Sequence, residues 1–211
     1  MVNKTKNENA SVEERILKAA EEEFLNKGFD GATTEAIARN AGVTHAMLHY
    51  YFRTKKNLFE KILNAKVDML IKVIFGTFKS SGLPFRERIT EAVKSHFDFI
   101  RKNPELPRFI INEFNSGSRR GILLDKKIWE IIPKLGEELQ KAIDEESAKG
   151  VANRIDAINI IMDAVSLNIF PFLVLPFLKN IGAPFAEYEK DFLDMRREES
   201  IKVITGRLFN R

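Results

Sequence analysis

The sequence predicts an all-α protein with two helical domains, and three observations support this fold class. The chain has only 11 glycines and 7 prolines among 211 residues, and these fall between segments of apolar periodicity. Apolar residues recur at the three- and four-residue spacing of helices, and no stretch of any length alternates with the period of a strand. Beyond residue 75 we expect helices at 84–102, 105–115, 125–147, 152–179 and 187–209.

The N-terminal segment predicts a polar tail followed by a helix. Residues 1–10 contain no apolar run, and the first helix is expected to begin at Ser11. Ser11 and Glu14 have the spacing of a capping box, in which each side chain accepts a hydrogen bond from the other residue's backbone N–H. One apolar face of this helix comprises Ile16, Leu17, Ala20 and Phe24. Gly28 is expected to end it, because glycine readily adopts the left-handed conformation found at helix ends.

Residues 33–52 have the pattern of a helix-turn-helix, which is two short helices joined by a glycine-containing turn. The first helix is expected over 34–40, the turn at Gly42 and the second helix over 44–51. A fourth helix begins after Thr54. The predicted domains are therefore a tail at 1–10, a three-helix head at 11–60 and a C-terminal helical domain at 61–211, with their boundary inside the fourth helix.

This arrangement suits DNA binding, because the second helix of such a motif places its N-terminal residues against base edges in the major groove. Leu48 should face the core. The side chains left facing outward are His45, Ala46, Met47, His49 and Tyr50. Thr34 and Thr54 begin helices whose free N–H groups attract phosphate, and Lys55 opens the fourth helix. Residues 39–61 carry five basic side chains and one acidic side chain.

The ordered motifs of this region resemble the signature of the TetR family. The segments that match are Thr33-Thr34-Glu35-Ala36-Ile37-Ala38, Ala41-Gly42-Val43-Thr44, Leu48-His49-Tyr50-Tyr51-Phe52, Thr54-Lys55 and Leu58-Phe59. Phe24 and Gly28-Phe29 match the first helix of the family. The similarity covers about residues 12–63.

The resemblance implies a homodimer bound to a palindromic operator in double-stranded DNA, usually a repressor released by a small molecule. Carried over by position, the phosphate contacts are Thr34, Thr44, Tyr50 and Lys55, and the residues near bases are His45, Ala46 and Met47. His49 departs from the family pattern, which has a phosphate-contacting tyrosine there. A neutral histidine is expected to make the same bond, and a protonated one to add charge.

The C-terminal domain is rich in phenylalanine, which at helical spacing indicates either ordinary core or the wall of a ligand pocket. The candidate pocket residues are Phe75, Phe78, His96, Phe97, Phe109, Phe114 and Phe170. A small apolar or amphipathic ligand is the expected occupant. The segment 170–177 contains Pro171 and Pro176, so it predicts either an irregular loop or a kinked helix in a pocket wall or dimer seam.

Two apolar stripes along each of the last two helices predict burial on both sides, hence a partner subunit or complete burial within one chain. The candidate dimer residues are Ile161, Val165, Leu193, Ile201, Ile204 and Leu208.

Composition narrows the other possibilities. The chain has no cysteine and a formal net charge of +4, which permits an anionic partner without requiring one. The longest apolar stretch, 169–178, contains two prolines and is shorter than the ~20 residues of a membrane helix, so a soluble cytoplasmic protein is expected. The pair His45 and His49 lacks a third ligand nearby, so we expect no metal and no cofactor. No catalytic motif indicates an enzyme, and the alternative functions are a helical interaction module or a small-molecule-binding protein without DNA binding.

Overall fold

The computed structural model describes residues 11–78, 82–115, 121–184 and 188–210, and all regular structure in these ranges is helical. The predicted fold class is therefore confirmed. The helices are α1 (Val12–Gly31), α2 (Thr34–Ala41), α3 (His45–Phe52), α4 (Lys55–Phe78), α5 (Phe85–Lys102), α6 (Leu106–Asn115), α7 (Gly121–Ala148), α8 (Ala157–Asn180) and α9 (Glu189–Phe209).

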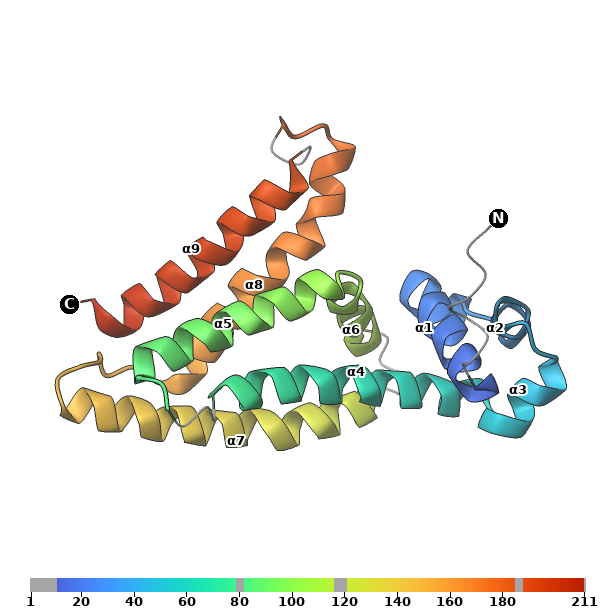
Figure 1. Cartoon of the computed structure of the whole chain (residues 1–211), viewed down its shortest axis with the longest axis horizontal. Helices are drawn as coiled ribbons and strands as arrows, with labels where there is room; N and C mark the ends of the chain where they lie inside the picture. The colour runs from blue at the N-terminus through green and yellow to red at the C-terminus, as the bar shows by residue number, and fades with distance from the viewer. Residues whose placement is uncertain (1–10, 79–81, 116–120, 185–187, 211) are drawn as a thin grey trace, which may run out of the picture.

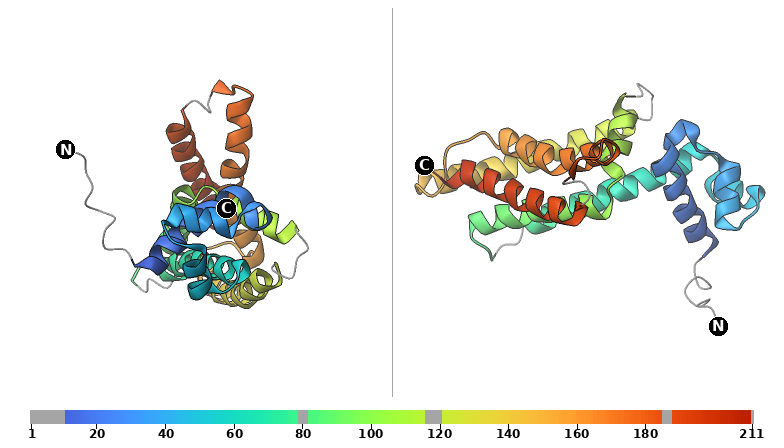
Figure 2. Two further views of the ribbon diagram at one scale, coloured as in Figure 1. Left: turned by 90° about the vertical axis from the view of Figure 1, so that its right-hand side faces the viewer. Right: turned by 90° about the horizontal axis from the view of Figure 1, so that it is seen from above.

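The molecule is elongated, with the first three helices at one end (Figure 1). Helix α4 runs from this head into a body formed by α5 to α9. The C-terminus lies at the far end of the body, away from the head (Figures 1 and 2). The long helix α4 thus provides a direct mechanical connection between the two regions.

The start of α1 confirms the predicted capping box. The Ser11 backbone N–H donates to Glu14 Oε2 at 2.7 Å, and the Glu14 backbone N–H donates to Ser11 Oγ at 3.2 Å. Gly28 interrupts this helix as predicted, with φ +68°, and a further helical turn then continues to Gly31. Glycine takes this left-handed backbone without the Cβ clash that other residues suffer.

Head and body share one hydrophobic core, centred on Phe59 of α4. Its ring meets Phe24 and Phe29 of α1 edge-on, with centroid distances of 5.1 and 5.0 Å. It also packs at 5.3 Å against Phe109 of α6. A charged link runs alongside, since Lys66 Nζ lies 2.5 Å from Glu21 of α1 and donates to Asn103 at the end of α5. The predicted boundary near residue 60 therefore falls inside a continuous core rather than at a flexible linker.

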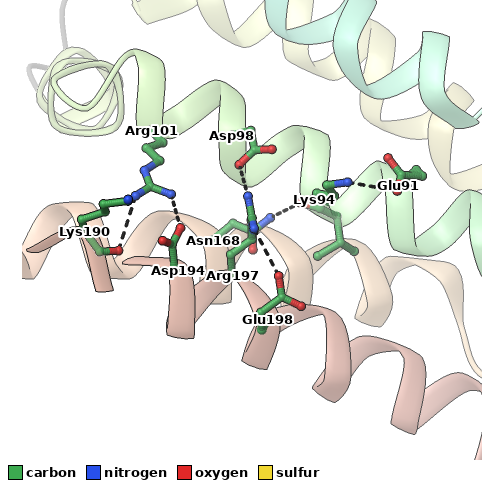
Figure 3. Close-up of polar contacts among 10 residues, drawn as sticks. Glu91, Lys94, Asp98, Arg101, Asn168, Lys190, Asp194, Arg197 and Glu198 are labelled. Carbon is green, nitrogen blue, oxygen red and sulfur yellow. Dashed lines mark hydrogen bonds and ion pairs between the residues drawn. The ribbon is translucent and has the colours of Figure 1, made fainter. Parts of the chain in front are cut away.

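A second core lies toward the far end of the body, where α5, α7, α8 and α9 meet. Ile143, Ile204 and Leu208 are fully buried there. Between the two cores, α5 and α9 are tied by ion pairs shown in Figure 3. Arg101 donates to Asp194 at 2.5 Å and Arg197 donates to Asp98 at 3.1 Å.

Helix α8 continues through both Pro171 and Pro176, so the loop alternative for 170–177 was wrong. By length and composition this 24-residue helix is apolar enough to cross a membrane, which the prediction missed because it counted only the unbroken apolar run 169–178, bounded by Asn168 and Lys179. One such helix is weak evidence for a membrane span. Here α8 packs on α5, α7 and α9, and it buries the polar side chain of Asn168 completely.

Candidate DNA interface and ligand cavity

Threonine side chains cap the start of both short helices of the head. Thr33 Oγ1 accepts from the Ala36 N–H at 3.2 Å, which begins α2. Gly42 ends α2 at φ +65° and ψ +38°, a left-handed conformation that turns the chain sharply. Thr44 Oγ1 then accepts from the Met47 N–H at 3.2 Å and begins α3. The left-handed backbone of Gly42 and the side-chain cap of Thr44 thus fix the two ends of the turn.

Helix α3 has one buried face and one open face. Leu48 is 0% exposed and belongs to the core with Ile37 and Phe52. The five predicted outward residues, His45, Ala46, Met47, His49 and Tyr50, are all exposed. Tyr50 is 83% exposed, an unusual environment for so large an aromatic side chain. The open face therefore has the shape and composition of a recognition surface.

Two histidines are held in place on this face. His45 Nε2 lies 3.0 Å from Thr34 Oγ1 and 3.6 Å from a Glu35 carboxylate oxygen. The His45 and His49 rings meet edge-on with their centroids 4.4 Å apart. These contacts join the start of α2 to the start of α3 and limit the side-chain rotamers that His45 adopts.

The expectation for His49 needs correction. Its Nδ1 lies 2.8 Å from the Arg53 carbonyl oxygen, which only accepts hydrogen bonds, so Nδ1 carries the proton. In the neutral ring, Nε2 is then an acceptor and cannot donate to a phosphate oxygen. Only protonated His49 can replace the hydroxyl donor of a tyrosine at this position.

Lys55 also differs from its expected role as an open phosphate contact. Its Nζ donates to the Ala32 carbonyl at 2.7 Å and lies 4.5 Å from the centre of the Phe29 ring. The ammonium thus ties the start of α4 to the loop between α1 and α2. Thr54 caps α4 by accepting from the Asn57 N–H at 3.0 Å.

Three exposed cations border the recognition face and were not among the predicted site residues: Arg39, Arg53 and Lys56. Lys56 lies 3.5 Å from Glu60. Arg53, between α3 and α4, adopts φ +61°, the only non-glycine positive φ among the described residues. The basic character of 39–61 was visible in the sequence, but the exposure of individual side chains depends on the turn geometry.

A large apolar cavity lies in the body, with a volume of about 1160 Å³. Its described lining comes from α4, α5, α6, α7, α8 and α9, and only three lining side chains are polar: His96, Ser166 and Arg196. A volume of this size suits an organic ligand, since binding pockets typically measure roughly 300–1,000 Å³.

The predicted pocket residues divide into three groups. His96 and Phe170 line the cavity. Phe97 and Phe109 do not, because they are buried in the core against Phe172 and Phe59. The side chains of Phe75, Phe78 and Phe114 lie outside the described residues. Sequence reasoning missed the aliphatic lining, since isoleucine and leucine carry no signal that separates cavity from core.

His96 is buried and neutral. Asn168 Nδ2 donates to the Val93 carbonyl at 2.9 Å and lies 3.2 Å from His96 Nδ1. Because that amide donates, Nδ1 is the accepting nitrogen, and the neutral ring carries its proton on Nε2. Desolvation by burial lowers the pKa of His96 to about 4. The cavity wall therefore contains a neutral N–H donor at physiological pH.

The predicted dimer residues need partial correction. Leu193, Ile204 and Leu208 are at most 4% exposed within one chain, so their side chains cannot form a subunit interface. Ile161 is also buried, Ile201 is partly buried and Val165 is exposed. The exposed apolar residues on the last two helices are Ile158, Met162, Val165, Phe170 and Phe177 on α8, and Met195 and Val203 on α9.

Comparison with known sequences places the head in a family. Residues 16–62 match the family model described as bacterial regulatory proteins, tetR family. The transcriptional activator FasR of Mycolicibacterium smegmatis is 31% identical over 96 residues, covering 46% of this chain and 43% of that protein. The transcriptional regulator RutR of Escherichia coli is 30% identical over 133 residues, covering 63% and 57%. The chain thus spans about half the length of these relatives.

The similarity of the fold extends over nearly the whole chain. A TetR-like transcriptional regulator from Rhodococcus sp. RHA1 superposes with a TM-score of 0.64 at 16% identity, covering 92% of this chain and 94% of that one. The C-terminal helices therefore have the arrangement of this architecture even where the sequences have diverged.

Proposed function

We propose that this chain, whose residues 16–62 match the model of the tetR family of bacterial regulatory proteins, belongs to that family and is a sequence-specific DNA-binding transcriptional regulator. It acts in the cytoplasm as a homodimer on a palindromic operator. The observation that carries the proposal is the open face of α3, which presents His45, Met47 and Tyr50 at the end of the molecule. Base edges in the major groove are the natural partners of such a face.

The exposed apolar stripe of α8 supports the dimer. Ile158, Met162 and Val165 follow one another at helical spacing and are all exposed in the single chain. Contact between two copies through this surface removes the stripe from water and sets two α3 helices against successive major grooves. The expected operator has two half-sites related by a twofold axis.

The cavity supports regulation by a small molecule. It is lined by α4, which begins at the head, and by α8, which carries the dimer stripe. A ligand that prefers one arrangement of these helices shifts the spacing of the two heads. We propose that the protein represses transcription and that the ligand relieves this repression. Because FasR is named an activator, the experiment must also distinguish repression from activation.

Selection of binding sites from a random duplex library tests the proposal. The expected result is an inverted repeat, bound with an affinity that falls steeply with salt concentration because phosphate contacts release counterions. Enrichment of no sequence, or binding that is independent of salt, would contradict it. A reporter gene behind the selected operator then distinguishes repression from activation.

Variants separate the roles of the interface residues. His45→Ala should change the preference among sequences, since this side chain is placed at base edges. Lys56→Ala should weaken binding to all sequences equally and lower the salt slope. Lys56 is preferable to Lys55 for this purpose, because Lys55 also supports the fold through Ala32. Equal effects of both changes on every sequence would refute this division of roles.

A further inference from the structure

The polar groups of the cavity indicate what kind of ligand it takes. Eighteen of the described lining residues are apolar, so the main part of the ligand must be apolar as well. Within the lining, Arg196 is the only charged side chain. No ion pair of this guanidinium occurs among the residues that the structure describes. A cation beside so large an apolar volume calls for an anionic group on an otherwise apolar molecule.

Arg196 and His96 lie close along the helices that carry them. Arg101 pairs with Asp194 and Asp98 pairs with Arg197, so α5 and α9 run antiparallel (Figure 3). In this register Arg196 lies opposite residue 99, one turn from His96, or roughly 4.5 Å along the helix axis. Both side chains line the same cavity. His96 lies two and five positions before Asp98 and Arg101, so it points away from the face of α5 that pairs with α9. Arg196, without His96, is therefore the candidate anion site.

The imidazole is held as a donor. Asn168 is 0% exposed, and its amide fixes Nδ1 of His96 as an acceptor. Since His96 is 6% exposed and lies in the cavity wall, its Nε2–H is the hydrogen that a ligand oxygen meets. The cavity wall therefore offers a neutral donor at His96 and a cation at Arg196, and the cation is the partner that an anionic head group needs.

We propose that the cavity binds an elongated aliphatic monocarboxylate, a fatty acid, with its carboxylate on the guanidinium of Arg196. Its hydrocarbon chain lies among the isoleucine, leucine and phenylalanine side chains of α4, α6, α7 and α8. This inference rests on the proposed ligand control and specifies the chemistry of its ligand. An aliphatic alcohol of equal length lacks the charge and should bind more weakly.

Calorimetric titration of the full chain with tetradecanoic acid and with 1-tetradecanol, each below its micelle concentration, tests the proposal. The acid should bind at least tenfold more tightly than the alcohol. Arg196→Met should abolish this preference while leaving alcohol binding within about twofold. The matched control is Lys202→Met, since Lys202 is an exposed cation of the same helix outside the lining.

The possible outcomes are distinct. Equal binding of acid and alcohol, binding of neither, or a preference that survives in Arg196→Met would overturn the inference. Thermal unfolding and operator affinity of each variant show that it is folded. The titrations contain no DNA and therefore test only the fatty-acid inference. If the acid does not bind, sequence-selective DNA binding still supports the proposed function. Failure of DNA selection leaves the titration result standing.

Discussion

Arg53 shows how a single residue at the interface combines backbone strain with charge. Its positive φ is unfavourable for any residue with a Cβ, at a cost of roughly 1–3 kcal/mol. The same backbone places its carbonyl on His49 and leaves an exposed guanidinium between α3 and α4.

Replacing Arg53 with glycine should therefore separate the two effects. Arg53→Gly relieves the backbone strain, which stabilises the folded state, but glycine also raises the conformational entropy of the unfolded chain, which opposes this gain. The net free energy of unfolding should rise by about 1 kcal/mol. DNA affinity should fall for all sequences alike. Chemical denaturation and anisotropy titrations check the two parts, and Arg53→Lys, which keeps strain and charge, is the control. A loss of stability in the glycine variant would contradict the account.

His96 makes stability depend on pH. Its folded pKa of about 4 lies below the ordinary value of 6.5, so the unfolded chain binds the proton more readily. The resulting stability is present above pH 6.5 and is lost as the pH falls toward 4. Between pH 7 and pH 5 the loss should be about 2 kcal/mol. Urea denaturation of the chain and of His96→Phe at both pH values measures it, with His45→Ala as an exposed-histidine control. An unchanged pH dependence in His96→Phe would contradict this assignment.

At the scale of the element, α3 depends on a cap, Thr44, that is also a proposed DNA contact. Thr44 Oγ1 accepts from the Met47 N–H, which leaves its hydroxyl hydrogen for a phosphate oxygen. Thr44→Ala should lower the free energy of unfolding by about 1 kcal/mol and weaken DNA binding.

An aspartate at this position distinguishes capping from DNA contact. Thr44→Asp restores the cap and should recover stability, but its negative charge repels phosphate, so DNA affinity should fall below that of Thr44→Ala. Thermal unfolding and anisotropy measurements on the two variants are sufficient. Recovery of DNA binding in Thr44→Asp would show that Thr44 acts only as a cap.

The elements of the head follow from local signals, whereas the sites in the body do not. Ser11, Gly42 and Thr44 specify helix ends through bonds to near neighbours, and the structure has all three where the pattern placed them. Phe97 and Phe170 have the same side chain, yet one is buried in the core and the other lines the cavity. That difference arises from packing between helices distant in sequence, which periodicity within one helix does not encode.

The same limit explains the corrections at α9. Two apolar stripes along this helix predicted burial on both sides, but only the stripe with Ile204 and Leu208 is buried, and its own chain covers it. Met195 and Val203 of the other stripe are exposed in the single chain. Likewise, the exposure of Lys55 depends on Ala32 and Phe29, 23 and 26 positions earlier in the chain.

At the scale of the whole molecule, the proposed dimer makes a direct prediction. Met162→Lys introduces a charge into the centre of the exposed α8 stripe and should convert the dimer to a monomer, because an unpaired charge is costly in an apolar interface. Binding to the palindrome should fall much more than binding to a half-site. Sedimentation velocity and anisotropy titrations measure both. The control is Met69→Lys, since Met69 is a similarly exposed methionine on α4. If the Met162→Lys protein were still a dimer, the interface would lie elsewhere.

The aromatic cluster around Phe59 also bears on whether regulators of this kind can be recombined. A chimera that exchanged only 11–52 would join a new α1 to an α4 and α6 shaped for the old one, and the contacts of Phe24 and Phe29 with Phe59 would be mismatched. A transplant of DNA specificity must therefore carry Phe59 and the facing side of α6 along with the head. Replacing only the outward side chains of α3 leaves that cluster intact and is the simpler way to redirect the protein to another promoter.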